Sequence, residues 1–373
     1  MQEENIQLLG VPLKDEAIDA ILQTKTEALD IMTKRLLLLS RHSTFFLLAS
    51  LSIPRLIYFL RCSPTWRKMS LLEKYDATLK SSLETILNIS PSRDAWLQSS
   101  LTVKMGGFGI RHSVNMAIPC LLASLNSSLS YLESLLPVDI FLNTTIIVKA
   151  QKFWETSCYA EEHTLFDLTI STNTAEDKAR LLAAQCMTSG SWLNALPSPQ
   201  LGTHMSGETF RTSVAIRLGA DVCQSYRCLR GAAVLDKSLH GLARKLSRGR
   251  ISRYDDALNN DMLQALRTAG VPCIREPPGC SRSDGKKPHG QILVPWRRGR
   301  CLIWNVPCRD TFASSHLSET AKTAGYAAAE KKKIRPTVEP LRVHTRDLRN
   351  KRGVGQEILK VDTKNRNTYH FYN

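Results

Sequence analysis

The chain has 373 residues, of which 43% are hydrophobic and 23% are charged. This composition excludes wholesale disorder, and the length predicts two or three domains. Fifty Lys and Arg against 34 Asp and Glu give a formal net charge of +16. Such a surplus favours a polyanionic partner, most often DNA or RNA.

The positive charge is concentrated in the second half of the chain. Residues 1–150 hold 15 Lys and Arg against 13 Asp and Glu, whereas residues 151–373 hold 35 against 21. We therefore expect the first part to be a structural module and the second part to carry the polyanion-binding surface.

The sequence favours a nuclear or cytoplasmic protein with no membrane partner. Its ten cysteines form no regular framework, and no basic segment followed by an apolar run opens the chain, so we expect no signal peptide. Residues 45–60 are strongly apolar, but Arg55 interrupts them. The run before Pro54 is about ten residues long, shorter than the roughly 18 that a membrane span needs. A buried helix kinked at Pro54 is the better interpretation.

Apolar residues recur with a 3.6-residue period through the first part of the chain. This pattern predicts helices over 15–39, 44–62, 68–89 and 112–136, and their short connections suggest an antiparallel bundle. The glycine-rich run 105–110 lacks the Lys-Ser/Thr ending of a phosphate loop, so it predicts a tight bend between helices.

Further along, residues 137–205 read as a connector with helices around 147–158 and 174–188 and a linker at 197–203. Helices are expected at 207–218, 253–268 and 318–334, and strands at 291–294 and 301–306. Asp255 and Asp256 would lie in the first turn of the 253–268 helix, where acids complement the helix dipole. From Pro336 the apolar period is lost, which predicts a basic, solvated tail over 336–373.

Two residues are candidate zinc ligands, Cys228 and His240, with Cys223 nearby. A structural zinc site needs four ligands, usually in closely spaced pairs, and the second member of each pair is absent here. We therefore do not expect tightly bound zinc.

A weak nuclease pattern lies between residues 275 and 333. Glu276, Asp284 and Asp310 are acids that could hold Mg²⁺, and Lys287 and Lys331 are nearby bases. The strand positions that should carry acids in such a site hold His289 and Asn305 instead. Any surviving nuclease activity would require Mg²⁺.

Two basic clusters are candidate nucleic-acid-binding surfaces. The first consists of Arg244, Lys245, Arg248 and Arg250, and the second of Trp296, Arg297, Arg298 and Arg300. Arginine and lysine neutralise phosphates and release counterions, while an exposed tryptophan can stack on bases.

Taken together, several long collinear runs resemble the C-terminal half of the polyprotein of non-LTR retrotransposons that carry a restriction-like endonuclease. The run 8–13 resembles the end of the reverse transcriptase palm, and 52–64, 71–88 and 96–114 resemble its thumb. The runs 217–228 and 239–245 resemble the zinc knuckle, and 269–306 resembles the PD-(D/E)XK-like endonuclease. The resemblance covers residues 5–335.

The departures from the family pattern fall on metal ligands. The resemblance implies cysteines where Arg230 and Arg244 stand, and aspartates where His289 and Asn305 stand. It also implies that the polymerase aspartates would lie before residue 1. Imidazole and amide in place of two carboxylates remove two negative charges from a Mg²⁺ site.

The expected fold is a mainly α, thumb-like N-terminal bundle plus a small α/β restriction-endonuclease-like domain. The expected segments are a palm end (1–13), a thumb-like bundle (14–136), a connector (137–205), a degenerate zinc-knuckle region (206–268), an endonuclease-like domain (269–335) and the tail (336–373).

The expected function is that of a truncated retroelement protein that binds DNA or RNA with little or no catalysis. A separate polymerase palm domain is a further candidate partner. Two alternatives stay open. One is an active metal-dependent endonuclease using Glu276, Asp284 and Asp310, and the other is a domesticated nucleic-acid-binding or adaptor module.

Overall fold

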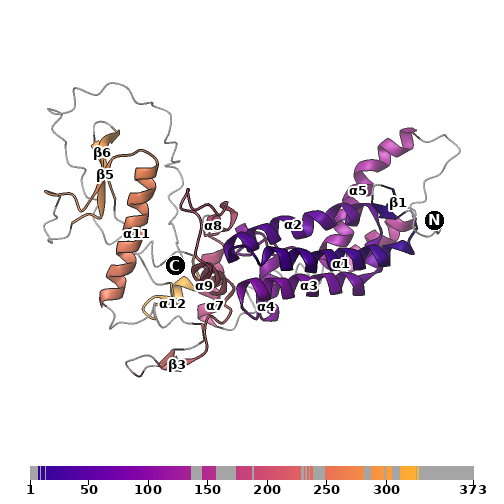
Figure 1. Cartoon of the computed structure of the whole chain (residues 1–373), viewed down its shortest axis with the longest axis horizontal. Helices are drawn as coiled ribbons and strands as arrows, with labels where there is room; N and C mark the ends of the chain where they lie inside the picture. Colours follow the sequence, from indigo (N-terminus) through magenta and orange to yellow (C-terminus); the bar gives the residue numbers. More distant parts are fainter. Residues whose placement is uncertain are drawn as a thin grey trace. The chain divides into compact units, whose positions relative to one another are not determined.

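The structure of the chain is a computed structural model (Figure 1). It describes residues 7–8, 10–12, 14–135, 145–156, 174–186, 189–227, 231, 233–234, 236–237, 248–280, 287–297, 300–304, 311–324 and 326. These residues fall into two compact units. One lies within 1–239 together with 321–324, and the other lies within 240–320 together with residue 326.

Four long helices form the bundle of the first unit. They are α1 (Ala17–Leu36), α2 (Arg41–Cys62), α3 (Met69–Leu87) and α5 (Ser113–Leu135). All four helices predicted from the apolar period are confirmed within a few residues of their expected bounds. Helix α1 packs on α3 and α2 packs on α5, as Figure 1 shows for the indigo and violet helices. A short antiparallel pair, β1 (Gln7–Leu8) and β2 (Val11–Pro12), precedes them.

The apolar period of these helices becomes the core of the first unit. Leu22, Leu48, Leu72, Leu79 and Leu83 are each 0% exposed. Burying one such side chain contributes about 1.5–3 kcal/mol, so the repeated leucines account for much of the bundle's stability.

Helix α2 is the apolar segment that the sequence singles out. Among the described helices, it is long and apolar enough to cross a membrane by length and composition. Its residues Leu48, Leu56 and Phe59 are at most 1% exposed and belong to the bundle core. The expected helix is therefore present with Pro54 inside it, and one side of it is buried whereas Tyr58 is 46% exposed.

Helix α5 begins against a carboxylate supplied by α3. Asp76 accepts hydrogen bonds from the backbone N–H groups of Ser113 at 2.7 Å and Val114 at 3.1 Å. These donors would otherwise lack partners in the first turn of a helix. Asp76 thus caps a helix that lies 37 residues further along the chain.

The predicted bend lies between α4 (Arg93–Ser100), a 3₁₀ turn η3 (Val103–Met105) and α5. A Cβ atom on Gly107 would lie 2.1 Å from the carbonyl oxygen of Leu101, and Gly106 has a φ of +92°. Only glycine fits such a close backbone approach, which is the physical reason for the glycine pair.

The remaining helices of the first unit are α7 (Ala175–Ala184), α8 (Ser191–Asn194) and α9 (Gly207–Leu218), and residues 145–156 are also helical. Phe210, Val214 and Leu218 of α9 belong to the same core as the bundle helices. The boundary expected at 205/206 is therefore not where the two units divide, because the apolar side of α9 packs into the bundle core. A second antiparallel pair, β3 (Tyr226–Arg227) and β4 (Ala233–Val234), follows.

The second unit contains α11 (Arg248–Thr268), β5 (Cys273–Arg275), β6 (Gly290–Arg297), β7 (Arg300–Trp304) and α12 (Leu317–Thr320). The strands form an antiparallel sheet in the order β5-β6-β7. Its core is Ile292, Cys301 and Trp304, packed against Leu263, Leu266, Val271 and Cys273. The chain is thus mainly helical in its first part, with a small α/β unit after it.

The second unit differs from the prediction in three details. Strand β5 was not predicted, because three residues are too few for a periodic signal. Helix α11 begins at Arg248 rather than 253, so Asp255 and Asp256 lie beyond its first turn. The helix expected at 318–334 is wrong over its first part, because α12 ends at Thr320 and residues 321–324 form turns and a bend; residues from 327 onward lie outside the described part.

Candidate functional site

One end of the β5-β6-β7 sheet brings together two of the predicted nuclease residues, Glu276 and His289. The backbone N–H of Glu276 donates to the carbonyl of His289 at 3.1 Å, and the N–H of His289 donates to the carbonyl of Trp304 at 3.1 Å. Lys287, which is exposed, lies two residues before His289. The end of β5, the start of β6 and the end of β7 therefore meet at this point.

Glu276 directly follows strand β5 and has an unusual backbone conformation. Its φ is +46°, in the left-handed region that non-glycine residues rarely adopt, and its side chain is 54% exposed. Two prolines, Pro277 and Pro278, follow it. This conformation turns the chain sharply out of the sheet and leaves the carboxylate at the surface.

Arg275 holds the acids at this end of the sheet. Its guanidinium bonds to the carboxylate of Asp256 on α11, to Oδ1 of Asn260 at 2.9 Å and to Oε1 of Glu276 at 3.5 Å. Residues 256 and 260 lie one helical turn apart on α11, which places them on one side of the helix. The arginine therefore links α11 to β5 and offsets one of the two negative charges of Asp256 and Glu276.

Asn259 is the second link between α11 and the sheet, and it is only 2% exposed. Its Nδ2 donates to the carbonyl of His289 at 3.1 Å, and its Oδ1 accepts from the indole Nε1 of Trp304 at 3.0 Å. One buried amide thus holds the start of β6 and the end of β7 against the helix. This pair of contacts fixes the backbone position of His289.

This arrangement is poorly suited to a hard cation. Mg²⁺ is held by carboxylate oxygens, but Glu276 and Asp256 both contact the positive charge of Arg275. A metal ion here would have to displace that guanidinium. Across the described residues, no group of three or more His, Cys, Asp or Glu is placed to hold a metal ion.

Arg275 and Asn259 were missed in the sequence analysis. The signal that could have found them is the polar stripe of Asp256, Asn259 and Asn260 on an otherwise amphipathic helix. The spacing of three and four residues in this stripe predicts a polar helix face. The spacing does not predict that Arg275 and His289 are the partners of this face.

Several predicted site residues lie outside the described part of the chain. These are Asp284, Asn305, Asp310 and Lys331 of the nuclease pattern, Cys228 and His240 of the zinc pattern, and Arg244, Lys245 and Arg298 of the basic clusters. Arg248, Arg250, Arg297 and Arg300 are described by their backbone alone, in α11, β6 and β7.

The second basic cluster lies at the opposite end of β6 from Glu276 and His289. Arg297 of β6 is paired with Arg300 of β7 where the hairpin closes. Gly290 and Arg297 are seven residues apart, so the two ends of the strand are separated by about 20 Å. The two tryptophans of this region differ, because Trp296 is 37% exposed whereas Trp304 is 6% exposed. Trp296 alone of this pair is accessible for stacking.

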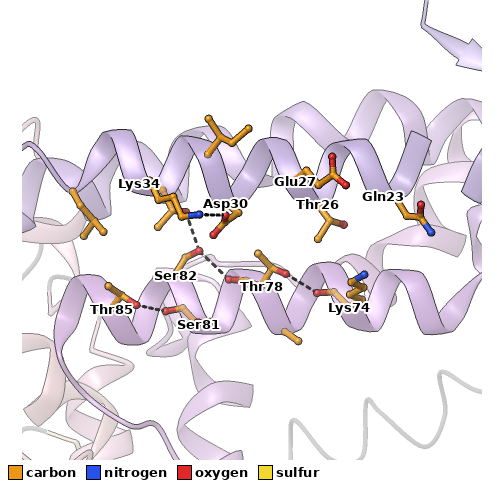
Figure 2. Close-up of a pocket in the computed structure, with 14 residues that line it drawn as sticks. Gln23, Thr26, Glu27, Asp30, Lys34, Lys74, Thr78, Ser81, Ser82 and Thr85 are labelled. Carbon is orange, nitrogen blue, oxygen red and sulfur yellow. Dashed lines mark hydrogen bonds and ion pairs between the residues drawn. The ribbon is translucent and has the colours of Figure 1, made fainter. Parts of the chain in front are cut away.

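The first unit carries an open groove of about 1000 Å³ between α1 and α3 (Figure 2). Small hydroxyl side chains form its floor, where Thr33 Oγ1 donates to Ser82 Oγ at 2.9 Å. An ion pair of 2.6 Å between Lys34 and Asp30 lies at its edge. The Thr33–Ser82 and Lys34–Asp30 pairs satisfy one another, and the charged residues Glu27 and Lys74 also line the groove.

Comparisons with known proteins do not identify the chain. No protein-family model matches it, and no curated protein matches it.

Proposed function

We propose that these 373 residues are part of a retroelement protein, corresponding to the region after its polymerase aspartates, and that they bind DNA or RNA with little or no catalysis. The observation that carries the proposal is the charge of the second unit. Residues 240–320 hold 14 Lys and Arg against 7 Asp and Glu. A net charge of +7 on a unit this small favours phosphate binding.

The order of elements supports the assignment of this unit. The run 269–306, which resembles the family's endonuclease, contains β5, β6 and β7 and follows the long helix α11. A helix followed by a three-stranded antiparallel sheet is in keeping with the small α/β domain expected from the resemblance.

The contacts of Arg275 support the expectation of little catalysis. His289 stands where the family pattern has an aspartate, and its main chain is tied to Glu276 and Trp304. The nearby carboxylates of Glu276 and Asp256 face an arginine. Phosphate binding by basic residues does not depend on a metal, so it can persist where hydrolysis is lost.

The test combines binding and cleavage in the same tubes. The full chain is incubated with supercoiled plasmid in Mg²⁺ and in Mn²⁺, and binding is followed by gel shift at two salt concentrations. We expect binding that weakens steeply with salt and no nicking. Metal-dependent nicking that Asp284→Ala abolishes would overturn the proposal in favour of the endonuclease alternative.

A pair of charge-matched variants locates the binding surface. Arg248→Ala with Arg250→Ala removes two positive charges at the start of α11, and Lys149→Ala with Lys152→Ala removes two from an exposed stretch of the first unit. We expect the first variant to bind more weakly than the second. Equal affinities would place the nucleic-acid surface outside this cluster, and absence of binding by the unmodified chain would refute the proposed function.

A further inference from the structure

The β6-β7 hairpin extends beyond the rest of the sheet as a two-stranded ribbon. The last pair between β5 and β6 is Cys273 with Ile292, after which the N–H of Leu293 donates to the carbonyl of Pro272 at 2.8 Å. From Val294 onward β6 pairs with β7 alone. The ribbon therefore has neither a third strand nor a pairing partner on its other edge within the described residues.

The side chains of this ribbon are unusually exposed for their apolar character. Leu293 is 49% exposed, Val294 is 40% exposed and Trp296 is 37% exposed, and Leu302 of the facing strand is 37% exposed. Four consecutive residues of β6, 293–296, are exposed, so the ribbon is uncovered along this stretch. Exposed apolar side chains gathered in this way mark an interaction surface.

The backbone of the ribbon is bulged. The pairing register shifts between Gln291 and Pro295 and again between Pro295 and Arg297. Bulges add residues to one strand, bend it and increase its right-handed twist. A strongly twisted two-stranded ribbon follows the curvature of a helical groove better than a flat one does.

The positive charge at the end of the ribbon favours a negatively charged partner. Arg297 and Arg300 are paired across the end of the hairpin, which places one arginine on each strand at the same level. The acids of this unit that the structure describes near the sheet, Asp256 and Glu276, contact Arg275 at the other end of β6. The ribbon thus carries exposed apolar residues along its two strands and an arginine on each strand at the end where the two strands join.

We propose that the β6-β7 hairpin enters the major groove of duplex DNA, with Val294, Trp296 and Leu302 against the groove floor and the paired Arg297 and Arg300 at the phosphates. This inference rests on the proposed nucleic-acid binding and names its ligand and contact surface. The B-DNA major groove is about 12 Å wide, admits a two-stranded ribbon and exposes thymine methyl groups to apolar side chains.

Single-stranded nucleic acid fits the ribbon less well. Non-specific single-strand sites usually stack successive bases on several aromatic side chains. The hairpin has one exposed aromatic residue, because Trp304 is buried and its indole is bonded to Asn259. Duplex RNA fits less well still, because its major groove is deep and narrow and side chains cannot read it.

The experiment compares three fluorescein-labelled ligands of one sequence, a 25-base-pair DNA duplex, the single DNA strand and the RNA duplex. Binding of the full chain is measured by fluorescence anisotropy over a salt series. The variants are Arg297→Ala with Arg300→Ala and, separately, Trp296→Ala. Lys149→Ala with Lys152→Ala is the control, because it removes the same charge from the first unit.

We expect the double arginine variant to bind the DNA duplex at least tenfold more weakly, with a log–log salt slope smaller by about 1.8, which corresponds to two lost phosphate contacts. Trp296→Ala should also weaken duplex DNA binding, by severalfold. Neither variant should change affinity for duplex RNA by more than twofold, and the control should bind all three ligands as the unmodified chain does.

Four results would overturn the inference. An equal loss for DNA and RNA duplexes would indicate general charge attraction, and a loss confined to the single strand would indicate stacking. Duplex DNA binding that survives both variants would leave the proposed function standing and refute the hairpin's role. If the unmodified chain binds none of the ligands, the proposed function fails as well.

Arg297→Lys with Arg300→Lys is a control for misfolding, because it keeps the charge and should keep most of the affinity.

Discussion

The indole Nε1 of Trp304 donates a hydrogen bond of 3.0 Å to Oδ1 of Asn259, and both side chains are at least 94% buried. The same amide donates through Nδ2 to the carbonyl of His289. A helix and two strands of the second unit are therefore joined through one polar side chain inside a small core. In a unit whose apolar core is this small, such polar contacts weigh heavily in the free energy of unfolding.

Replacing Asn259 with alanine should destabilise the second unit by about 2 kcal/mol, because a buried indole N–H loses its partner and the carbonyl of His289 loses one of its two donors. Urea unfolding followed by tryptophan fluorescence measures the change. Gln264→Ala, an exposed substitution on the same helix, serves as the control and should shift the free energy by less than about 0.5 kcal/mol. Equal effects of the two substitutions would mean that the amide contacts contribute nothing.

Gly290→Ala should also destabilise the second unit, by about 1–3 kcal/mol. A Cβ atom at this position would lie 2.0 Å from Cζ2 of Trp304, inside the indole ring. The indole is buried and hydrogen-bonded, so it has little room to move. Thermal unfolding of the variant measures the loss.

Gly207→Ala is the matched control for that experiment. Its new Cβ atom would meet the flexible side chain of Arg41 at 3.2 Å rather than a ring, at the first residue of a helix. We expect little change in the unfolding midpoint. A Gly290 variant as stable as this control would show that the sheet adjusts around Trp304 at no cost.

Arg217→Met should destabilise the first unit by about 3 kcal/mol. The guanidinium is 3% exposed and donates to the carbonyls of Val103 at 3.0 Å, Ala184 at 3.1 Å and Ser189 at 3.3 Å. Methionine keeps the apolar stem but removes every donor, so each of the three carbonyls loses a charged hydrogen bond and keeps one other donor. A hydrogen bond to a charged group contributes about 1.5–3 kcal/mol.

Lys34→Met is the comparison for Arg217, because it removes a cation from the exposed pair with Asp30. Such surface pairs contribute about 0–1 kcal/mol. Chemical unfolding of both variants followed by circular dichroism measures the difference. A loss of similar size in the two variants would contradict the role assigned to the buried guanidinium.

Acidification should destabilise the first unit between pH 6.5 and pH 4. Burial lowers the pKa of His42 to about 4, with a further contribution from the nearby His204, and burial alone lowers the pKa of His112 to about 4. Below pH 6.5 the unfolded chain binds protons at these positions and the folded chain does not, so stability falls as the pH falls. The contribution of the two neutral histidines to the free energy of unfolding is fully present above pH 6.5.

Urea midpoints at pH 7.5, 5.5 and 4.0 measure this dependence. His42 Nδ1 accepts a hydrogen bond from the N–H of Met205 at 3.1 Å, and its ring stacks on Phe210 at 4.5 Å. His42→Gln and His112→Gln should each flatten the acid side of the profile. A variant that keeps the full decrease would exclude its histidine as the cause.

The helices of the first unit were predictable because each buries one continuous face, and that face recurs every 3.6 residues. The apolar residues of α1, α2 and α3 that define the pattern are the ones that the core buries. The bend at Gly106 and Gly107 was predictable as well, because a glycine-rich run is itself a local signal for a turn. In contrast, the packing of α9 into this core was not, because the sequence pattern gives the face of a helix and not its partner.

The candidate site was predictable only in part. Residue types alone pointed to Glu276 and His289, and the structure places their main chains in contact. That Arg275 holds the acids of this end, and that Trp304 is buried while Trp296 is exposed, depended on strand pairing and on the position of α11. The nucleic-acid partner stays a prediction.

The sequence by itself thus determined the helices of the first unit and the basic character of the second unit, because periodicity and charge are local properties of the chain. The tertiary structure decided which side chains meet. Contacts such as Asp76 with Ser113, Arg275 with Asp256 and Asn259 with Trp304 join residues 19 to 45 positions apart. Such pairs form only when whole helices and strands pack, since packing rather than local preference brings distant groups within hydrogen-bonding reach.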